Sequence, residues 1–158
     1  MPSQAAAIGE RLRREVANVC KMIALEIDKE LRRRTPVDTG HARRNWIPSV
    51  GVPARVEAKD DRPHAEGVAA VLSYQLADGA LWVANNVPYI RRLNYGHSSQ
   101  APAGFVEMAI DAALARVARK VKNTAIDVTA MRSSFQSEVG GSAAENLASA
   151  YDPFGGDW

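Results

Sequence analysis

The stretch LRRRTPVDTGHARRNW, residues 31–46, holds the signals that end one element and start the next. Pro36 disfavours helical geometry at the residue before it, so a helix that runs into this stretch should end near Arg33 or Arg34. Three consecutive arginines at this point also suit the negative C-terminal end of a helix dipole. The sequence therefore predicts a helix boundary just before the proline.

Residues 35–40 have the composition of a tight turn. Pro36 fixes one backbone dihedral, Asp38 can bond its own downstream backbone, and Gly40 permits a positive φ. We expect this turn to deliver the chain into a strand that starts within residues 43–47.

Upstream of the turn, apolar residues recur every three or four positions. This spacing is typical of a long amphipathic helix with one apolar stripe. The stripe consists of Ile8, Leu12, Val16, Val19, Ile23, Ile27 and Leu31. Ser3 is a candidate N-cap for this helix.

Downstream of the turn, the pattern is one of short mixed elements. Residues 54–58 can form a second short strand, and the polar, proline-containing residues 59–65 have the composition of a loop. Alanine content and apolar spacing favour a helix over residues 66–77, and residues 80–85 have the pattern of a buried strand.

The next segment begins with a short helix over residues 89–95. Pro88 suits the first turn of such a helix, and Gly96 suits its end. A loop over residues 97–104 leads to a second long helix, because apolar residues repeat at helical spacing over residues 106–128.

These elements predict an α+β fold, in which a small few-stranded β-sheet packs against two long amphipathic helices. We expect one domain over residues 1–132 and an extended acidic tail over residues 133–158, which are rich in Ser, Gly and Ala and typical of a disordered segment. Tyr151, Phe154 and Trp158 are unusual in a solubilising tail. We interpret them as candidate anchors for a partner; a tail docked within its own chain and an inert end are the alternatives.

The composition is that of a soluble globular protein: of 158 residues, 46% are hydrophobic and 24% charged. No window approaches the roughly 18 apolar residues that a membrane-spanning helix needs. The N-terminus also lacks the pattern of a secretory signal. One cysteine, Cys20, cannot form an internal disulfide, which is typical of a protein from a reducing cytosol.

The net charge of +2 conceals an asymmetry. All 20 basic residues lie at or before Arg132 and four of the 18 acidic residues lie after it, so residues 1–132 carry +6 and residues 133–158 carry −4. A basic body with an acidic tail suggests contact with a polyanion and docking on a basic partner. A solvated surface with a solubilising tail is the simpler alternative.

The tripeptide Asp38-Thr39-Gly40 is shared with aspartic proteases. In those enzymes two aspartates share one proton to activate water. This sequence has no second such triplet, and the first follows a helix end rather than an apolar strand. We interpret the tripeptide as a turn and keep an aspartic-type hydrolase as an alternative.

No other motif points to catalysis. The three histidines, His41, His64 and His97, are isolated and do not have metal-ligand spacing. The sequence also lacks a P-loop, a dinucleotide-binding glycine motif and a nucleophile elbow. We therefore expect no enzymatic activity, no metal and no cofactor.

Four arginines are candidates to face DNA, namely Arg43, Arg44, Arg91 and Arg92. Such side chains contact phosphates without reading base sequence. A nucleic-acid-binding accessory protein without sequence specificity is therefore an alternative function.

Three blocks occur in a fixed order: TPVDTGHARRNW (35–46), VANNVPYIRRLNYG (83–96) and QAPAGFV (100–106). With the long helix before them, and over residues 5–128, the chain resembles the neck and tail-completion proteins of long-tailed bacteriophages, also described as minor tail components. The order of the blocks makes the match specific. His97-Ser98-Ser99 departs from the aromatic or threonine-serine variant expected after the glycine.

The resemblance implies a virion structural protein without catalysis. It implies a ring at the head–tail junction, six-fold or else twelve-fold, that contacts the tail tube and the head-completion or connector proteins. Packaged double-stranded DNA would pass through the ring, and assembly would take place in the host cytoplasm. The motif residues then have structural roles: Thr35, Pro36, Asp38, Thr39, Gly40, Trp46, Asn85, Asn86, Pro88, Tyr89, Tyr95, Gly96 and Pro102.

Overall fold

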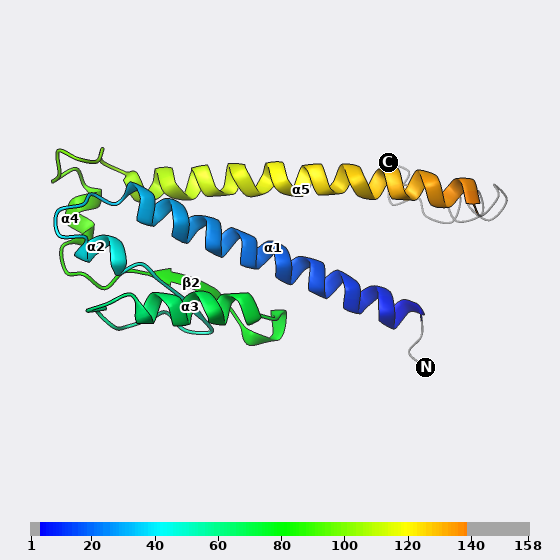
Figure 1. Ribbon diagram of the computed structural model, residues 1–158, viewed down its shortest axis with the longest axis horizontal. Coiled ribbons are helices and arrows are strands. Elements are labelled where there is room, and N and C mark those ends of the chain that lie inside the picture. Colours follow the sequence, from blue (N-terminus) through cyan, green and yellow to red (C-terminus); the bar gives the residue numbers. More distant parts are fainter. Residues whose placement is uncertain (1–3, 139–158) are drawn as a thin grey trace, which may run out of the picture. The chain divides into compact units, whose positions relative to one another are not determined.

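The structure is a computed structural model that describes the backbone of residues 4–138 and the side chains of residues 4–123. The elements follow the order α1, α2, β1, α3, a short 3-10 helix η1, β2, α4 and α5 (Figure 1). The chain divides after Ala118 into two compact units, residues 1–118 and 119–158. The first unit contains every element from α1 to the beginning of α5.

The first helix, α1 (Gln4–Arg34), ends where the proline predicts. The backbone N–H of Thr35 donates to the carbonyl of Leu31 at 3.0 Å, and the Thr35 hydroxyl donates to the same oxygen at 2.6 Å. Pro36 follows, and it has no N–H with which to continue the helical ladder. The predicted end of the first helix is therefore confirmed.

The apolar stripe of α1 is covered only in its second half. Ile8 is 67% exposed and Leu12 63% exposed, whereas Ile27 and Leu31 lie at the core. A 31-residue helix is about 46 Å long, while a four-residue strand spans only about 13 Å. The small sheet is too short to cover the whole stripe.

A helical turn precedes the first strand. Helix α2 (His41–Arg44) includes the first two residues of the segment 43–47, and strand β1 (Ile47–Val50) starts at the last residue of that segment. Gly40 adopts a φ of 78° and turns the chain, and the Arg44 N–H donates to the Gly40 carbonyl at 3.0 Å. One turn of helix therefore closes before the chain extends, and the prediction of a strand that starts within residues 43–47 is confirmed at Ile47, the last residue of that range.

Within the described residues, the sheet has two strands. Strand β2 (Leu81–Ala84) pairs with β1 in antiparallel fashion, with Ile47 opposite Ala84. The strand predicted over residues 80–85 is confirmed. Helix α1 contacts both strands.

The strand predicted over residues 54–58 is absent. Side-chain amides bind this segment instead of a neighbouring strand: Asn45 Oδ1 accepts from the Ala58 N–H at 2.5 Å, and Asn86 Nδ2 donates to two carbonyls of the segment at 2.9 and 3.0 Å. Backbone polar groups need a partner, and these asparagines supply one without a sheet ladder.

Helix α3 (Arg62–Ser73) starts inside the predicted loop 59–65 and ends before the predicted helix 66–77 does. Pro63 lies in its first turn, where the missing N–H would be unpaired in any case. A capping box then starts the separate 3-10 turn η1 (Leu76–Asp78). The predicted helix exists, but it begins and ends about four residues earlier than the sequence predicts.

Helix α3 lies directly on β1. A Cβ atom built on Gly67 of α3 would come within 2.0 Å of the Pro48 carbonyl oxygen of β1. Only a glycine allows this approach of helix backbone to strand backbone.

Helix α4 (Ile90–Asn94) confirms the short helix predicted over residues 89–95, and Gly96 has a φ of 87° just after its end. Helix α5 (Phe105–Glu138) begins where the second long helix is predicted. It continues through the first six residues of the expected tail, and residues 139–158 lie outside the described structure.

The core of the first unit joins residues from distant parts of the chain. Its buried members are Leu31, Trp46, Ala101, Phe105 and Ala109, with partly buried residues from β2 and α4 against them. The α+β fold predicted from the sequence is therefore confirmed, with a small antiparallel sheet and α1 packed on it.

Candidate assembly surface

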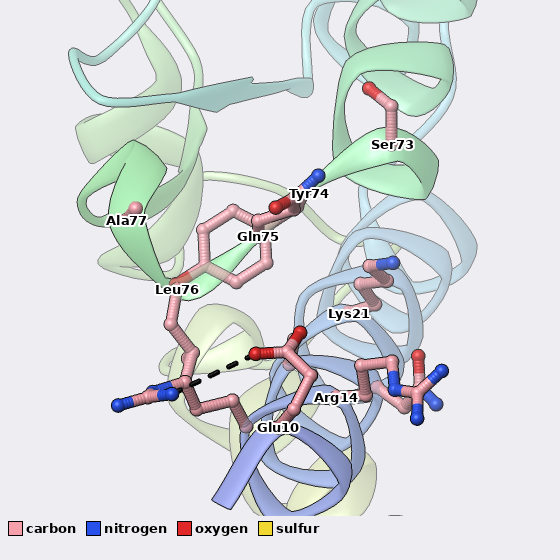
Figure 2. Close-up of a pocket in the computed structure, with 11 residues that line it drawn as sticks. Glu10, Arg14, Lys21, Ser73, Tyr74, Gln75, Leu76 and Ala77 are labelled. Carbon is pink, nitrogen blue, oxygen red and sulfur yellow. Dashed lines mark ion pairs between the residues drawn. The ribbon is translucent and has the colours of Figure 1, made fainter. Parts of the chain in front are cut away.

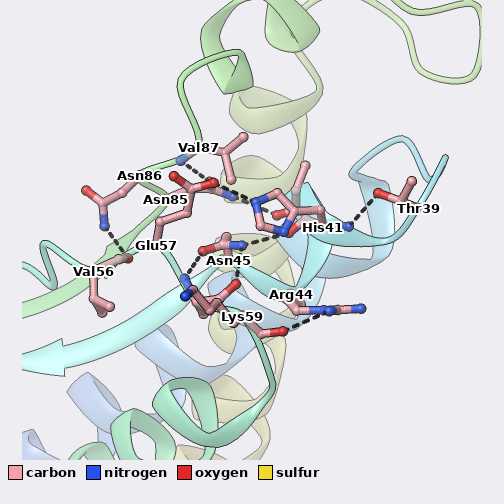
Figure 3. Close-up of polar contacts among 12 residues, drawn as sticks. Thr39, His41, Arg44, Asn45, Val56, Glu57, Lys59, Asn85, Asn86 and Val87 are labelled. Atoms are coloured by element: carbon pink, nitrogen blue, oxygen red, sulfur yellow. Dashed lines mark hydrogen bonds and ion pairs between the residues drawn. The ribbon is translucent and has the colours of Figure 1, made fainter.

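The buried side chain of Asn45 ties α2 to the segment after β1 (Figure 3). Its Oδ1 accepts from the Ala58 N–H, and its Nδ2 donates to the carbonyls of His41 at 2.9 Å and Ala58 at 3.1 Å. An amide has one acceptor group and two donors, and all of them are used here. This side chain fixes the backbone around it.

The two asparagines of the second block bind the first block and its neighbourhood. Asn85 Nδ2 donates to the Ala42 carbonyl at 2.8 Å, and Asn85 Oδ1 accepts from the Val87 N–H at 3.1 Å (Figure 3). Asn86 binds the carbonyls of Ala54 and Val56. Both asparagines act on backbone groups, as structural residues do.

Thr35 and Trp46 link the end of α1 to the core. Trp46 Nε1 donates to Thr35 Oγ1 at 2.7 Å, and both side chains are buried. Because the threonine hydroxyl also donates to the Leu31 carbonyl, it is both donor and acceptor. The helix end and the indole therefore hold each other in place.

The first two blocks meet around a small hollow of about 200 Å³, next to the third block. The hydrogen bond from the Val37 N–H to Gln100 Oε1, at 3.0 Å, brings in the third block. Eleven residues line the hollow: Pro36, Asp38, Thr39, Gly40, His41, Ala42, Tyr89, Leu93, His97, Ser98 and Gln100. Asp38 is the one carboxylate among them, so the hollow does not supply the pair of carboxylates that aspartic-type chemistry needs.

The remaining motif residues lie at the surface. Tyr95 is 71% exposed, and Pro88, Tyr89 and Pro102 are also exposed. Gly96 lies close to Ala103: a Cβ atom built on Gly96 would come 3.2 Å from the Cβ of Ala103. These residues shape a surface rather than a buried site.

Sequence reasoning missed the role of Asn94. Its carbonyl accepts from the Gly104 N–H at 2.7 Å, its Oδ1 accepts from the Val106 N–H at 2.9 Å, and its Nδ2 donates to the Glu107 carboxylate. The bond from Asn94 Nδ2 lowers the pKa of Glu107, and the bonds to the Gly104 and Val106 N–H groups cap the start of α5. The sequence does not reveal that Asn94 accepts hydrogen bonds from the Gly104 and Val106 N–H groups, because the loop between Asn94 and Gly104 has no regular geometry.

A second missed feature is the buried carboxylate of Glu30. Arg33 Nη2 lies 2.6 Å from it, Arg34 Nε 3.2 Å and Arg116 Nη2 2.7 Å. The hydrogen bonds from Arg33, against the effect of burial, hold the pKa of Glu30 below its ordinary value. The spacing of Glu30 to Arg33 and Arg34 was a usable signal; the partner on α5 was not.

Asp28 and His64 join α1 to α3. His64 Nε2 lies 2.9 Å from Asp28 Oδ2, and Asp28 is buried. Burial raises the pKa of Asp28, and the interactions with His64 and Arg32 oppose that rise. The pair connects the two helices at a desolvated position.

The four candidate DNA-facing arginines differ in their surroundings. Arg44 Nη1 donates to the Lys59 carbonyl at 3.2 Å. Arg43, Arg91 and Arg92 are exposed, and in the described part of the chain their side chains form no ion pair. These three guanidinium groups are accessible to phosphate. The candidate anchors Tyr151, Phe154 and Trp158 lie outside the described residues.

Two features are absent from the residues that the structure describes. No helix is long and apolar enough to cross a membrane. No group of three or more His, Cys, Asp or Glu side chains is placed to hold a metal ion. In comparisons with known proteins, no family model, curated protein or solved structure matches the chain significantly.

Proposed function

We propose that the chain is a virion structural protein of the phage neck, which forms a ring at the head–tail junction. The ring completes the tail or joins it to the head, in contact with the tail tube and the head-completion or connector proteins. The proposal begins from the resemblance of three ordered sequence blocks to neck and tail-completion proteins.

The observation that best supports it is the way the three blocks meet. Asn85 of the second block binds the Ala42 carbonyl of the first, and Gln100 of the third binds the Val37 N–H of the first. Residues that recur together in a family for structural reasons should contact one another in this way. Their polar groups bind backbone and do not converge on a reacting centre.

Ring formation needs two different complementary faces on each subunit. The exposed part of the α1 stripe, Ile8, Leu12 and Val16, supplies apolar surface of the kind that subunit contacts cover. A six-fold ring is our first choice and a twelve-fold ring the second.

Packaged DNA passes through the ring in this proposal. Arg43, Arg91 and Arg92 offer positive charge without a base-reading motif, so the DNA contact would be independent of sequence. The same exposed arginines favour the second candidate function, a nucleic-acid-binding accessory protein without sequence specificity.

Imaging of purified particles tests the proposed location. A tagged copy of the chain should appear as a closed ring of density between head and tail, in six or twelve copies. The same tag on an unrelated cytoplasmic protein is the control. Particles that are infectious and contain none of the chain would contradict the proposal.

A further inference from the structure

A groove of about 430 Å³ runs between α1 and residues 73–77 (Figure 2). Its α1 wall carries three cations, Arg13, Arg14 and Lys21, and one carboxylate, Glu10. The opposite wall is formed by the segment that joins α3 to η1.

The positive charge of the groove is only partly balanced. Glu10 Oε2 lies 3.7 Å from Arg13 Nη1, and both side chains are mostly exposed. Arg14 and Lys21 form no ion pair with any described residue. Arg14 and Lys21 are therefore available to pair with an acidic ligand, and Arg13 is weakly paired with Glu10.

Apolar surface lies between these charges. Ala17 is buried, and the hydroxyl of Tyr74 donates a hydrogen bond to the Gly79 carbonyl at 3.0 Å, which holds the ring in place. Leu76 is 39% exposed at the opposite wall. A ligand that matches the groove needs aromatic or aliphatic side chains next to carboxylates.

We infer that the groove receives residues 139–158 of a second copy of the chain, an inference that rests on the proposed ring. This segment has three acidic residues and no basic residue. Aromatic residues adjoin two of the acids, in Tyr151-Asp152 and Asp157-Trp158. The segment is thus negatively charged, whereas the groove is positively charged. It also has apolar side chains that can contact the walls of the groove.

The length of the segment allows it to reach another subunit. Twenty residues can span up to about 66 Å when extended, which exceeds the diameter of a small domain. A segment and the groove that binds it are two unlike surfaces, which is what a head-to-tail contact requires. Each copy would donate its segment to one neighbour and accept that of the other.

Fluorescence anisotropy of a labelled peptide of residues 139–158, titrated with the full chain, tests this inference. We expect saturable binding that weakens between 50 and 300 mM salt, because partly exposed charges are screened. A peptide in which Tyr151, Phe154 and Trp158 are all replaced by serine should bind at least tenfold more weakly.

The groove is tested by the double variant Arg13→Glu, Arg14→Glu, which should weaken peptide binding at least tenfold. The matched control is Lys29→Glu, Arg55→Glu, which makes the same change in net charge at exposed positions outside the groove and should bind within twofold of the wild type. Thermal melting checks that all variants are folded.

Two results would overturn the inference. One is the absence of saturable binding, or binding that the groove variant leaves unchanged. The other is binding only to a chain that ends at Glu138 at concentrations where the full chain is a monomer, because the full chain would then fill its own groove. The peptide-binding assay needs no phage particle, so a negative result would overturn this inference and leave the proposed neck function standing. Conversely, imaging that finds none of the chain in particles would contradict the neck function even if the peptide binds the groove.

Discussion

Glu30 on α1 and Arg116 on α5 form an ion pair in which Arg116 Nη2 lies 2.7 Å from Glu30 Oε1. The glutamate side chain is fully buried, and the guanidinium group is about one-third exposed. Arg33 and Arg34 bind the same carboxylate from the α1 side. The buried Glu30 carboxylate thus binds three arginines, and its pair with Arg116 links the first part of α5 to α1.

Replacement of this carboxylate should destabilise the fold. The change Glu30→Gln removes the anion that three partly exposed guanidinium groups bind, and loss of hydrogen bonds to a charged group costs about 1.5–3 kcal/mol. Urea unfolding followed by circular dichroism would measure it. Glu10→Gln is the control, because its ion pair is exposed and should contribute less than about 0.5 kcal/mol. Equal effects of the two changes would show that the Glu30 cluster is unimportant.

Stability should also depend on acid pH through Glu30. Its pKa in the fold is below the ordinary 4.5, so its contribution is complete above that pH and is lost as the pH falls through the folded pKa. Asp28 has the opposite sign: its raised pKa favours folding as protonation proceeds. Unfolding free energies at pH 5.5, 4.5 and 3.5 should therefore decline less steeply in Glu30→Gln and more steeply in Asp28→Asn. Identical slopes in both variants and the wild type would contradict this assignment.

Gly67 and Gly9 offer a matched pair of helical glycines. A Cβ on Gly67 would come within 2.0 Å of the Pro48 carbonyl oxygen, whereas one on Gly9 would meet nothing within 4 Å. We expect Gly67→Ala to destabilise the protein by about 1–3 kcal/mol, since backbone must move. Gly9→Ala should stabilise it by about 0.5–1 kcal/mol through helix propensity. Thermal or urea unfolding that places both changes on the same side of the wild type would show that α3 does not lie against β1 as described.

The local elements could be predicted where one residue type decides the geometry. Pro36 ends α1, and Gly96 follows the end of α4 as expected. The strand at 80–85 was recognisable from its apolar run between turn residues. These signals act over a few residues and need no knowledge of the tertiary structure.

The failures arose where side chains from distant segments bind the backbone. Residues 54–58 have strand-like composition, but Asn45 and Asn86 bind their peptide groups and no strand pairs with them. The spacing of apolar residues in α1 also cannot show which of them are exposed, because the size of the sheet determines how much of the apolar stripe is covered. The hollow at which the sequence blocks meet also depends on the tertiary structure, whereas the block residues themselves can be recognised in the sequence.

Two asparagines that bind the same segment differ in burial, and so should the effects of replacing them. Asn45→Ala leaves buried peptide groups of Ala58 without a partner, which should cost about 2–3 kcal/mol. Asn86 is exposed, and water can replace its bonds, so Asn86→Ala should cost less than about 1 kcal/mol. Hydrogen exchange at the Ala58 amide should accelerate in the first variant alone. Unchanged exchange there would contradict the role given to Asn45.

The exposed arginines predict weak, salt-dependent DNA binding. Each lost phosphate contact lowers the slope of log affinity against log salt by about 0.9, so Arg91→Glu, Arg92→Glu should reduce it by up to about 2. Titration of a labelled duplex at several salt concentrations measures the slope, with Lys29→Glu, Arg55→Glu as the charge-matched control. Tight binding by the lone wild-type chain near physiological salt would instead favour the nucleic-acid-binding function.

Deletion of the gene that encodes the chain tests the central claim most directly. Electron microscopy of the lysate should show filled heads and separate tails, or tails of abnormal length, and supplying the wild-type chain should restore joined particles. Separate heads and tails would support a joining role, and long or ragged tails would support a cap on the tail. Intact, infectious particles in the absence of the chain would contradict the proposed neck function.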